Sequence, residues 1–349
     1  MKIKILVLLF LTASCAPTIK NFDKYQKQFL TKSKFLPSQE NLDGKTPKIA
    51  VFPFEDNDNL VASQAGLAKS MAANVENILT KNKLATLVDR AVTEKLAKEV
   101  QLAEMNKTGA FSGPQVADYA ISGVISNASF TNKYTDGSTY INPKTQTLVT
   151  VPPSFTYNSE VSGNIKIYEL PSMAVMENIE YSGSDSRKEN VQQDGGVSFG
   201  GLRIGGNQVD GAQRDDNLVR KAGEDAIIDI ESDIKNILGQ KGYILEKRTF
   251  ENKTIFKISI GSSNGIKHGD KIEIVGQFES ENPISQKIEV EKRVIAQAVV
   301  TNLIDPKSSW IILDDEKKSS QVRLGDVAKG KYKKSQLRSV MKMGKALVQ

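Results

Sequence analysis

The chain offers few residues for covalent chemistry. Cys15 is the only cysteine and His268 the only histidine among 349 residues. A single cysteine excludes an intramolecular disulfide and a zinc site built on several cysteines. His268 is far from Cys15 in sequence and is flanked by turn residues, with no carboxylate and serine pattern that would make a catalytic triad. Three roles remain for Cys15: a buried thiol, an unpaired reactive thiol or a processing site.

Two acidic clusters and a glycine-rich segment are the other candidates for chemistry. The acidic clusters, Asp56/Asp58 and 314–316, fall in predicted turns, where carboxylates are usually solvated, so we expect no metal site. Residues 195–206, GGVSFGGLRIGG, lack the Gly-Lys-Ser/Thr of a phosphate-binding loop and do not fit a dinucleotide fingerprint. A flexible or bulged hairpin is expected there instead. The sequence therefore predicts no enzymatic activity and no cofactor apart from the lipid discussed next.

The residues before Cys15 favour processing. Two lysines are followed by the apolar run 5–11, which is too short to span a bilayer, and then by the small residues 12–14. The end of this secretory signal resembles the lipobox of bacterial lipoproteins, although Thr12 stands where that family usually has Leu. The resemblance implies cleavage after a signal peptide of residues 1–14 and a covalent lipid on Cys15. A plain secreted or periplasmic protein is the alternative.

The resemblance to lipoproteins also implies a location. Ala16 stands where an Asp would signal retention in the inner membrane of many Gram-negative bacteria. We therefore expect the protein at the periplasmic face of the outer membrane, held there by its lipid anchor. The polar residues 15–46 are expected to be a tether from that anchor to the first folded domain.

The positive net charge of +6 comes from the C-terminal end of the chain. Residues 329–349 carry seven Lys and Arg and no acidic residue, and we take 331–349 as a basic tail. The expected state of the tail is a solvated terminus; anionic lipid or an acidic partner are alternatives. We expect no binding to nucleic acid, because the folded body lacks stacking aromatics interleaved with basic residues.

Hydrophobic periodicity predicts two domains. Strands over 49–52, 84–88 and 119–126 alternate with helices over 61–81 and 91–104, which is an α/β pattern. A strand over 161–170, another over 173–176 and a helix over 218–238 complete a domain of residues 47–239. Residues 240–330 hold about six short alternating segments and predict a small β-barrel or SH3/OB-like module. The expected fold is an α/β periplasmic domain with inserted β-hairpins, followed by a small all-β barrel-like domain.

Three segments of the first domain resemble the CsgG family of curli assembly and transport lipoproteins. They are KIAVFPFED (48–56), LATLVDRAVTEKLAKEVQLAEMNKTGAFS (84–112) and ADYAISGVISNASF (117–130). The resemblance covers residues 48–238. It implies a homo-oligomeric ring whose inserted hairpins build a β-barrel through the outer membrane.

The segments that match those insertions are 130–158 and 182–214. A membrane strand needs apolar side chains on alternate residues. The residues that share one parity are Thr147, Val149, Val151, Phe155 and Tyr157 in the first insertion and Val197 and Phe199 in the second. Pro152-Pro153 interrupts the first insertion. The sequence leaves two interpretations of these insertions: membrane strands, or long soluble loops or hairpins that form contacts within an oligomer.

The second domain is absent from CsgG. It has two Gly-Asp turns, at Gly269-Asp270 and Gly325-Asp326, and resembles the C-terminal β-module of the flagellar ring protein FlgT. This resemblance implies other envelope proteins as partners. Two functions are therefore expected: a CsgG-like outer-membrane assembly and secretion component, or a periplasmic scaffold ring without a pore.

Overall fold

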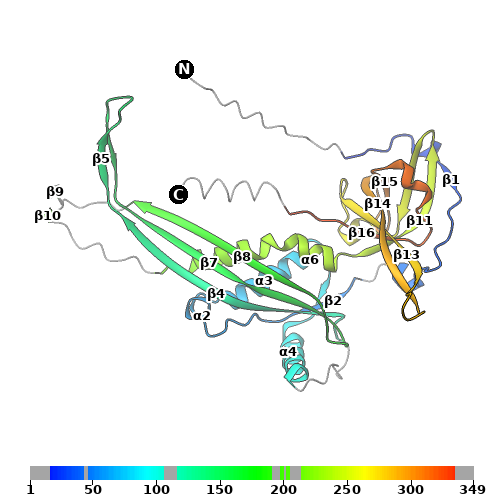
Figure 1. The fold of residues 1–349 in the computed structure, drawn as a ribbon, viewed down its shortest axis with the longest axis horizontal. Helices are drawn as coiled ribbons and strands as arrows, with labels where there is room; N and C mark the ends of the chain where they lie inside the picture. Colours follow the sequence, from blue (N-terminus) through cyan, green and yellow to red (C-terminus); the bar gives the residue numbers. More distant parts are fainter. Residues whose placement is uncertain are drawn as a thin grey trace. The chain divides into compact units, whose positions relative to one another are not determined.

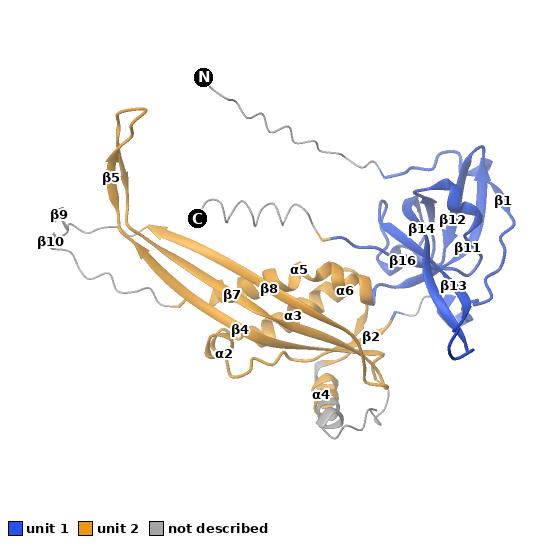
Figure 2. Ribbon diagram, viewed as in Figure 1, with its two compact units in different colours: residues 1–46, 238–333 blue, residues 47–237, 334–349 orange. Residues whose placement is uncertain are grey.

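The computed structural model describes residues 16–42, 46–105, 116–190, 197–199, 202–204 and 214–334 (Figure 1). These residues form two compact units (Figure 2). Unit 1 takes the described residues within Met1–Thr46 and Leu238–Lys333, and unit 2 takes those within Pro47–Ile237 together with Lys334. Cys15, the proposed lipid attachment point, lies outside the described residues.

Unit 2 is built on a five-stranded sheet with the strand order β3-β2-β4-β7-β8. Its strands are β2 (Lys48–Val51), β3 (Thr86–Leu87), β4 (Tyr119–Thr135), β7 (Ser154–Glu169) and β8 (Ala174–Asn190). β2 pairs in parallel with β3 and β4, as the strand–helix–strand pattern predicts, whereas β4, β7 and β8 form an antiparallel meander. The sheet is therefore mixed.

Helices cover both faces of the sheet at the end that holds β2. They are α2 (Leu60–Gln64), α3 (Leu67–Lys81), α4 (Arg90–Met105), α5 (Asp216–Asp229) and α6 (Glu231–Leu238). α5 packs along β7 and β8, and α3 packs between α5 and β2. Leu96 of α4 packs instead with Ala50 and Ala120. Successive side chains of a strand point to opposite faces, so Ala50 points away from the face of Ile49 and Val51. α4 therefore covers the face opposite to the one that α3 and α5 cover.

Two helices predicted as continuous are each divided in the structure. The apolar stripe of the 61–81 segment is buried as expected, but Gly66 adopts a left-handed backbone (φ 62°) and separates α2 from α3. Only glycine adopts this conformation at little cost. The predicted helix over 218–238 begins earlier, at Asp216, and is divided at Ile230 between α5 and α6.

Unit 1 contains a closed six-stranded antiparallel barrel. Its strands are β11 (Lys241–Phe250), β12 (Lys253–Ile258), β15 (Ser309–Leu313), β14 (Ile288–Ile304), β13 (Lys271–Glu281) and β16 (Val327–Gly330). Pairing of β11 with β16 closes the circle. Isoleucine dominates the core, whose fully buried members include Ile244, Phe256, Ile258, Ile260, Ile274 and Ile311. The barrel predicted for this region is therefore present.

The N-terminal segment differs from the tether expected over 15–46. β1 (Gln26–Gln28) pairs with β11, and Ile19 and Tyr25 are buried in a cluster with Ile255 and Trp310. The Asn302 side chain brackets the Ile19 backbone, accepting from its N–H at 2.7 Å and donating to its carbonyl at 3.4 Å. The segment holds too few apolar residues to show periodicity, but Ile19, Phe22 and Tyr25 pack on the barrel.

The two Gly-Asp turns of the barrel have one geometry. Gly269 and Gly325 adopt φ values of 89° and 86°. Asp270 and Asp326 each accept a hydrogen bond at 2.8 Å from the backbone N–H three residues earlier. The repeated sequence pattern thus corresponds to a repeated turn that leads into β13 and β16.

Among the residues that the structure describes, strand residues (45%) outnumber helical residues (23%), so the described part of the chain is mostly β. Part of the excess comes from β4, β7 and β8, which are longer than the strands predicted over 119–126, 161–170 and 173–176. The assignment of residues 47–239 to an α/β periplasmic domain stays a prediction.

Candidate functional site

The strands β4, β7 and β8 are much longer than α5, which packs along part of them, and they lead into both insertions (Figure 1). They have 17, 16 and 17 residues, so each is about 50 Å long at the usual rise per residue. We call residues 127–135, 154–162 and 182–190 the strand extension. Its register is continuous, from Asn127 opposite Ser162 to Thr135 opposite Ser154.

One face of the strand extension is aromatic. Phe155 and Tyr157 of β7 are buried against Leu218 of α5, with Phe130 and Tyr134 of β4 alongside. Ring centroids are 5.0 Å apart for Tyr134 and Phe155 and 6.1 Å apart for Phe130 and Tyr157. Two of the residues predicted to alternate on a membrane strand, Phe155 and Tyr157, therefore pack inside unit 2 in this structure.

Arg187 joins the end of β8 to the start of α5. Its guanidinium lies 3.0 Å from an Asp215 carboxylate oxygen and 3.2 Å from one of Glu189, and it stacks over Tyr157 with 5.4 Å to the ring centroid. Asp215 also caps α5, accepting from the N–H of Asn217 at 2.9 Å. Burial raises the pKa of Tyr157, and the Glu189 charge adds to this effect, so the phenol stays protonated.

The opposite face of the strand extension is polar. Its residues alternate with the aromatic ones and are mainly Ser, Thr and Asn. They are Asn127, Ser129, Thr131, Lys133, Thr156, Asn158, Glu160, Ser162, Ser182, Ser184, Ser186 and Lys188. The strand extension thus has one face with an aromatic cluster on β4 and β7, next to the charged Arg187 and Glu189 of β8, and one face that is hydrophilic throughout.

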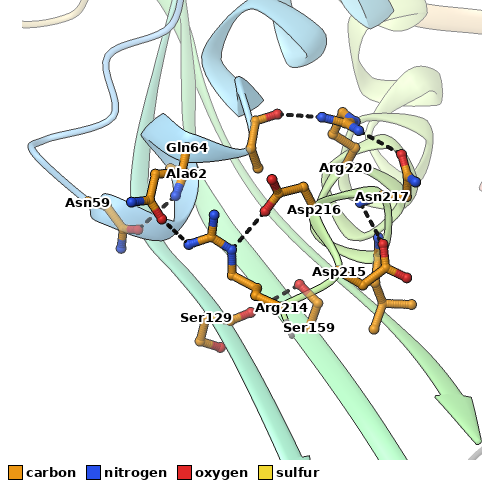
Figure 3. Close-up of polar contacts among 12 residues, drawn as sticks. Asn59, Ala62, Gln64, Ser129, Ser159, Arg214, Asp215, Asp216, Asn217 and Arg220 are labelled. Atoms are coloured by element: carbon orange, nitrogen blue, oxygen red, sulfur yellow. Dashed lines mark hydrogen bonds and ion pairs between the residues drawn. The ribbon is translucent and has the colours of Figure 1, made fainter. Parts of the chain in front are cut away.

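A polar network ties the base of the strand extension to two helix starts (Figure 3). Arg214 donates to Asp216 at 2.7 Å and to Gln64, while Arg220 donates to the Ala65 carbonyl at 2.9 Å. Asn59 caps α2 and also donates to the Ala128 carbonyl of β4 at 3.1 Å. The base of the strand extension is therefore held to α2 and α5, close to the point where the second insertion ends.

The first insertion continues the strand extension as a separate small hairpin. β5 (Ser138–Ile141) pairs with β6 (Leu148–Val151), and Pro152-Pro153 lies between β6 and β7. Val149 and Val151 thus belong to a different strand from Phe155 and Tyr157, and Thr147 lies in the turn just before β6. The exposed large apolar side chains of this hairpin are Tyr140, Ile141, Leu148 and Val151, with Leu148 exposed to 70%.

The second insertion is described only in part. β9 (Val197–Phe199) pairs with β10 (Leu202–Ile204), so the glycine-rich segment contains a hairpin. Val197 and Phe199 lie in this pair, and their side chains are outside what the structure describes.

The remaining candidates lie apart from the strand extension. His268 is exposed in the first Gly-Asp turn, with Nε2 3.1 Å from the Pro17 carbonyl oxygen. Asp315 caps the short helical turn Glu316–Ser320. Within the described ranges, three or more His, Cys, Asp or Glu residues nowhere gather as a metal site would require. The helices that the structure describes are all too short or too polar to cross a membrane.

Arg187 and Asp215 are the contacts that the sequence did not predict. Arg187 lies where the membrane-strand hypothesis required an apolar residue. Its partner Asp215 follows the second insertion in the sequence, so the spacing of residues did not predict this ion pair. The Asp215-Asp216 pair before a helical stripe is an N-cap pattern and would have placed the helix start correctly.

No family model matches the chain, and neither does any curated protein.

Proposed function

We propose that this protein is a lipid-anchored component of the outer membrane that assembles into a ring, with hairpins of neighbouring copies forming a secretion pore. The proposal takes up the resemblance of residues 48–238 to the CsgG family. The observation that carries it is the strand extension: three long antiparallel strands lead into both insertions, with an aromatic and a polar face.

The hairpin β5–β6 supports insertion in a membrane. Its apolar side chains are solvent-exposed in the monomer, and exposed aliphatic side chains clustered on a hairpin tip indicate a surface covered in the working state. Selectivity would come from the width of the ring and the side chains that line it. The proposed reaction is passage of a substrate and includes no covalent step.

A second function is favoured by the packing of the aromatic face. Phe155 and Tyr157 are covered by α5, and Arg187 pairs with Asp215 at the same place. A lipid-facing strand would instead expose its apolar residues. In this alternative the same ring stays periplasmic, without a pore, and unit 1 docks on another envelope protein as the resemblance to FlgT implies.

Single-particle electron microscopy of the detergent-purified lipoprotein, with liposome conductance alongside, separates the two functions. Conducting rings support the pore. Rings that do not conduct favour the periplasmic scaffold, and a monomer rejects both.

A matched pair of variants sharpens the conductance test. Leu148→Lys places a charge on an exposed apolar position, so it should leave the fold intact and lower conducting activity. Gln146→Lys, in the turn of the same hairpin, is the control because charged residues are tolerated at the ends of membrane strands. Equal conductance of the two variants argues against insertion of this hairpin.

The anchor is tested separately with Cys15→Ala. This change should abolish labelling by palmitate and move the protein from the membrane fraction to the soluble periplasmic fraction. Unchanged fractionation contradicts lipid attachment at Cys15.

A further inference from the structure

The free edge of β8 in unit 2 borders an acid-lined groove. β8 pairs with β7 along one side, and no described strand pairs with its other side. A groove of about 490 Å³ lies between this edge and α6. Its lining residues are Glu177, Asn178, Ile179, Glu180, Asp233, Asn236 and Ile237.

The groove has the chemistry of a site for a basic, partly apolar segment. Three carboxylates, of Glu177, Glu180 and Asp233, line the groove together with Ile179 and Ile237. In the described part of the chain, Glu177 and Glu180 form no ion pair. A basic segment in extended conformation would pair its backbone with the free strand edge while its cations neutralise the carboxylates. The groove therefore favours a cationic partner.

One acid of the groove already has a cationic partner. The Lys334 ammonium is 3.2 Å from an Asp233 carboxylate oxygen. The neighbouring acid of α6, Glu231, is engaged by Lys235 at 2.8 Å and Asn82 at 3.2 Å. Asp233 is therefore the acid of α6 that holds the C-terminal segment.

The chain beyond Lys334 matches the groove in charge and in polarity. Residues 335–349, SQLRSVMKMGKALVQ, contain Arg338, Lys342 and Lys345 and no acidic residue. Apolar side chains such as Met341 lie between the basic ones. Because this segment starts at the ion pair with Asp233, its effective concentration at the groove is high, in the millimolar range typical of short linkers.

We propose that residues 335–349 dock in this groove of the same chain, with the basic side chains on Glu177, Glu180 and Asp233 and the segment along the β8 edge. The docked segment covers a strand edge that would otherwise pair with another chain. This inference goes beyond the proposed function and does not depend on a pore or on lipid.

Disulfide trapping in the full chain tests the docking. In a Cys15→Ala background, Asn178→Cys is combined with Met341→Cys, which leaves all three carboxylates in place. The control combines Met341→Cys with Ala91→Cys, an exposed position on α4. Under mild oxidation the groove pair should cross-link about tenfold more than the control. Roughly 1 M salt, or the triple change Arg338→Gln, Lys342→Gln and Lys345→Gln, should remove most of this excess.

The outcomes are distinct. Equal cross-linking of the two pairs, or an excess that salt and the triple change leave intact, overturns the proposal. A disulfide that joins two chains on a non-reducing gel also overturns it and assigns the groove to the segment of a second copy. Cross-linking in the groove measures neither ring formation, conductance nor lipid attachment, so its failure leaves the proposed function untouched.

Discussion

Two aspartates of the barrel accept the same backbone hydrogen bond in different surroundings. Asp326 is buried, and the Arg323 guanidinium donates to it at 3.0 Å while also donating to the Gln277 carbonyl. Asp270 makes the equivalent turn in a half-exposed position. Burial nevertheless outweighs Arg323 and raises the pKa of Asp326 above its ordinary value. The folded protein therefore retains this proton to a higher pH than the unfolded chain does.

This pKa shift predicts a pH dependence of stability. The contribution of Asp326 is full below its unfolded pKa of about 4 and is lost as the pH rises through its higher folded pKa. We expect the free energy of unfolding of wild type, relative to Asp326→Asn, to fall as the pH rises from about 4 through the raised folded pKa. Urea unfolding followed by Trp310 emission measures this, since Trp310 is the only tryptophan and lies in unit 1. Asp270→Asn is the matched control, and an equal pH effect there would contradict the assignment.

The contact of α5 with β8 depends on the absence of a side chain at Gly183. A Cβ atom there would lie 2.2 Å from the Ala222 carbonyl oxygen and 2.5 Å from the Ala226 nitrogen, both backbone atoms of α5. Neither atom can move without shifting the helix. Small residues on both elements thus set how closely helix and sheet approach.

Gly183→Ala should destabilise unit 2 by about 3 kcal/mol, because overpacking against backbone cannot be relieved by a rotamer change. The expected signature is a circular dichroism transition at lower urea concentration while the Trp310 transition of unit 1 stays in place. Ser182→Ala, one residue away on the exposed face, is the control. A wild-type transition for Gly183→Ala would show that α5 adjusts freely.

The N-terminal segment is held to the barrel by aromatic contacts. Phe22 meets the Trp310 ring edge-on with 5.0 Å between centroids, and Arg248 lies over both rings. Phe22→Ser should therefore shift Trp310 emission to the red and speed proteolysis of residues 16–28. Phe29→Ser is the control, since Phe29 is 88% exposed. Equal emission from both variants would mean that the segment does not shield Trp310.

The sequence predicted the elements whose side chains are apolar on one face and missed those whose faces are polar. The stripe of Met71, Val75 and Ile78 identified α3, and the alternating isoleucines identified the barrel. The hairpins expected over 130–158 and 182–214 came without strand bounds, because one face of the strand extension is Ser, Thr and Asn, and a glycine such as Gly183 inside β8 is typical of turns. Hydrogen bonds between the strands and packing against α5 stabilise the strand extension, and hydrophobic periodicity in the sequence shows neither.

The candidate site was predicted at the level of the insertions and not of their contacts. The alternation of apolar residues identified Phe155 and Tyr157 as candidates, but it did not predict that they pack against Leu218 of α5. Which of two environments covers an apolar face, a helix of the same unit or a lipid, depends on tertiary packing that a single sequence does not encode locally.

The two units have separate cores, and unit 1 draws on both ends of the sequence. A fragment with residues 16–46 joined to 238–334 by a flexible linker should fold alone and show native Trp310 emission. Residues 238–334 by themselves lack β1 and the aromatic cover of Trp310. We expect a lower melting temperature for that shorter fragment, measured by circular dichroism. Equal melting temperatures would mean that the N-terminal segment adds no stability.

The pairing of Gln26 with Thr249 affects the order in which the parts of unit 1 fold. A chain that crosses a membrane from its N-terminus delivers β1 first and its partner β11 only after more than two hundred further residues. Closing so long a loop is slow, and until then the first residues have nothing to fold against. If Cys15 is the lipid attachment point, as proposed, the residues that follow it would thus have no folded partner during export. Completion of the barrel would end that interval, so the order of events, and not a dedicated linker, would keep the attachment point open.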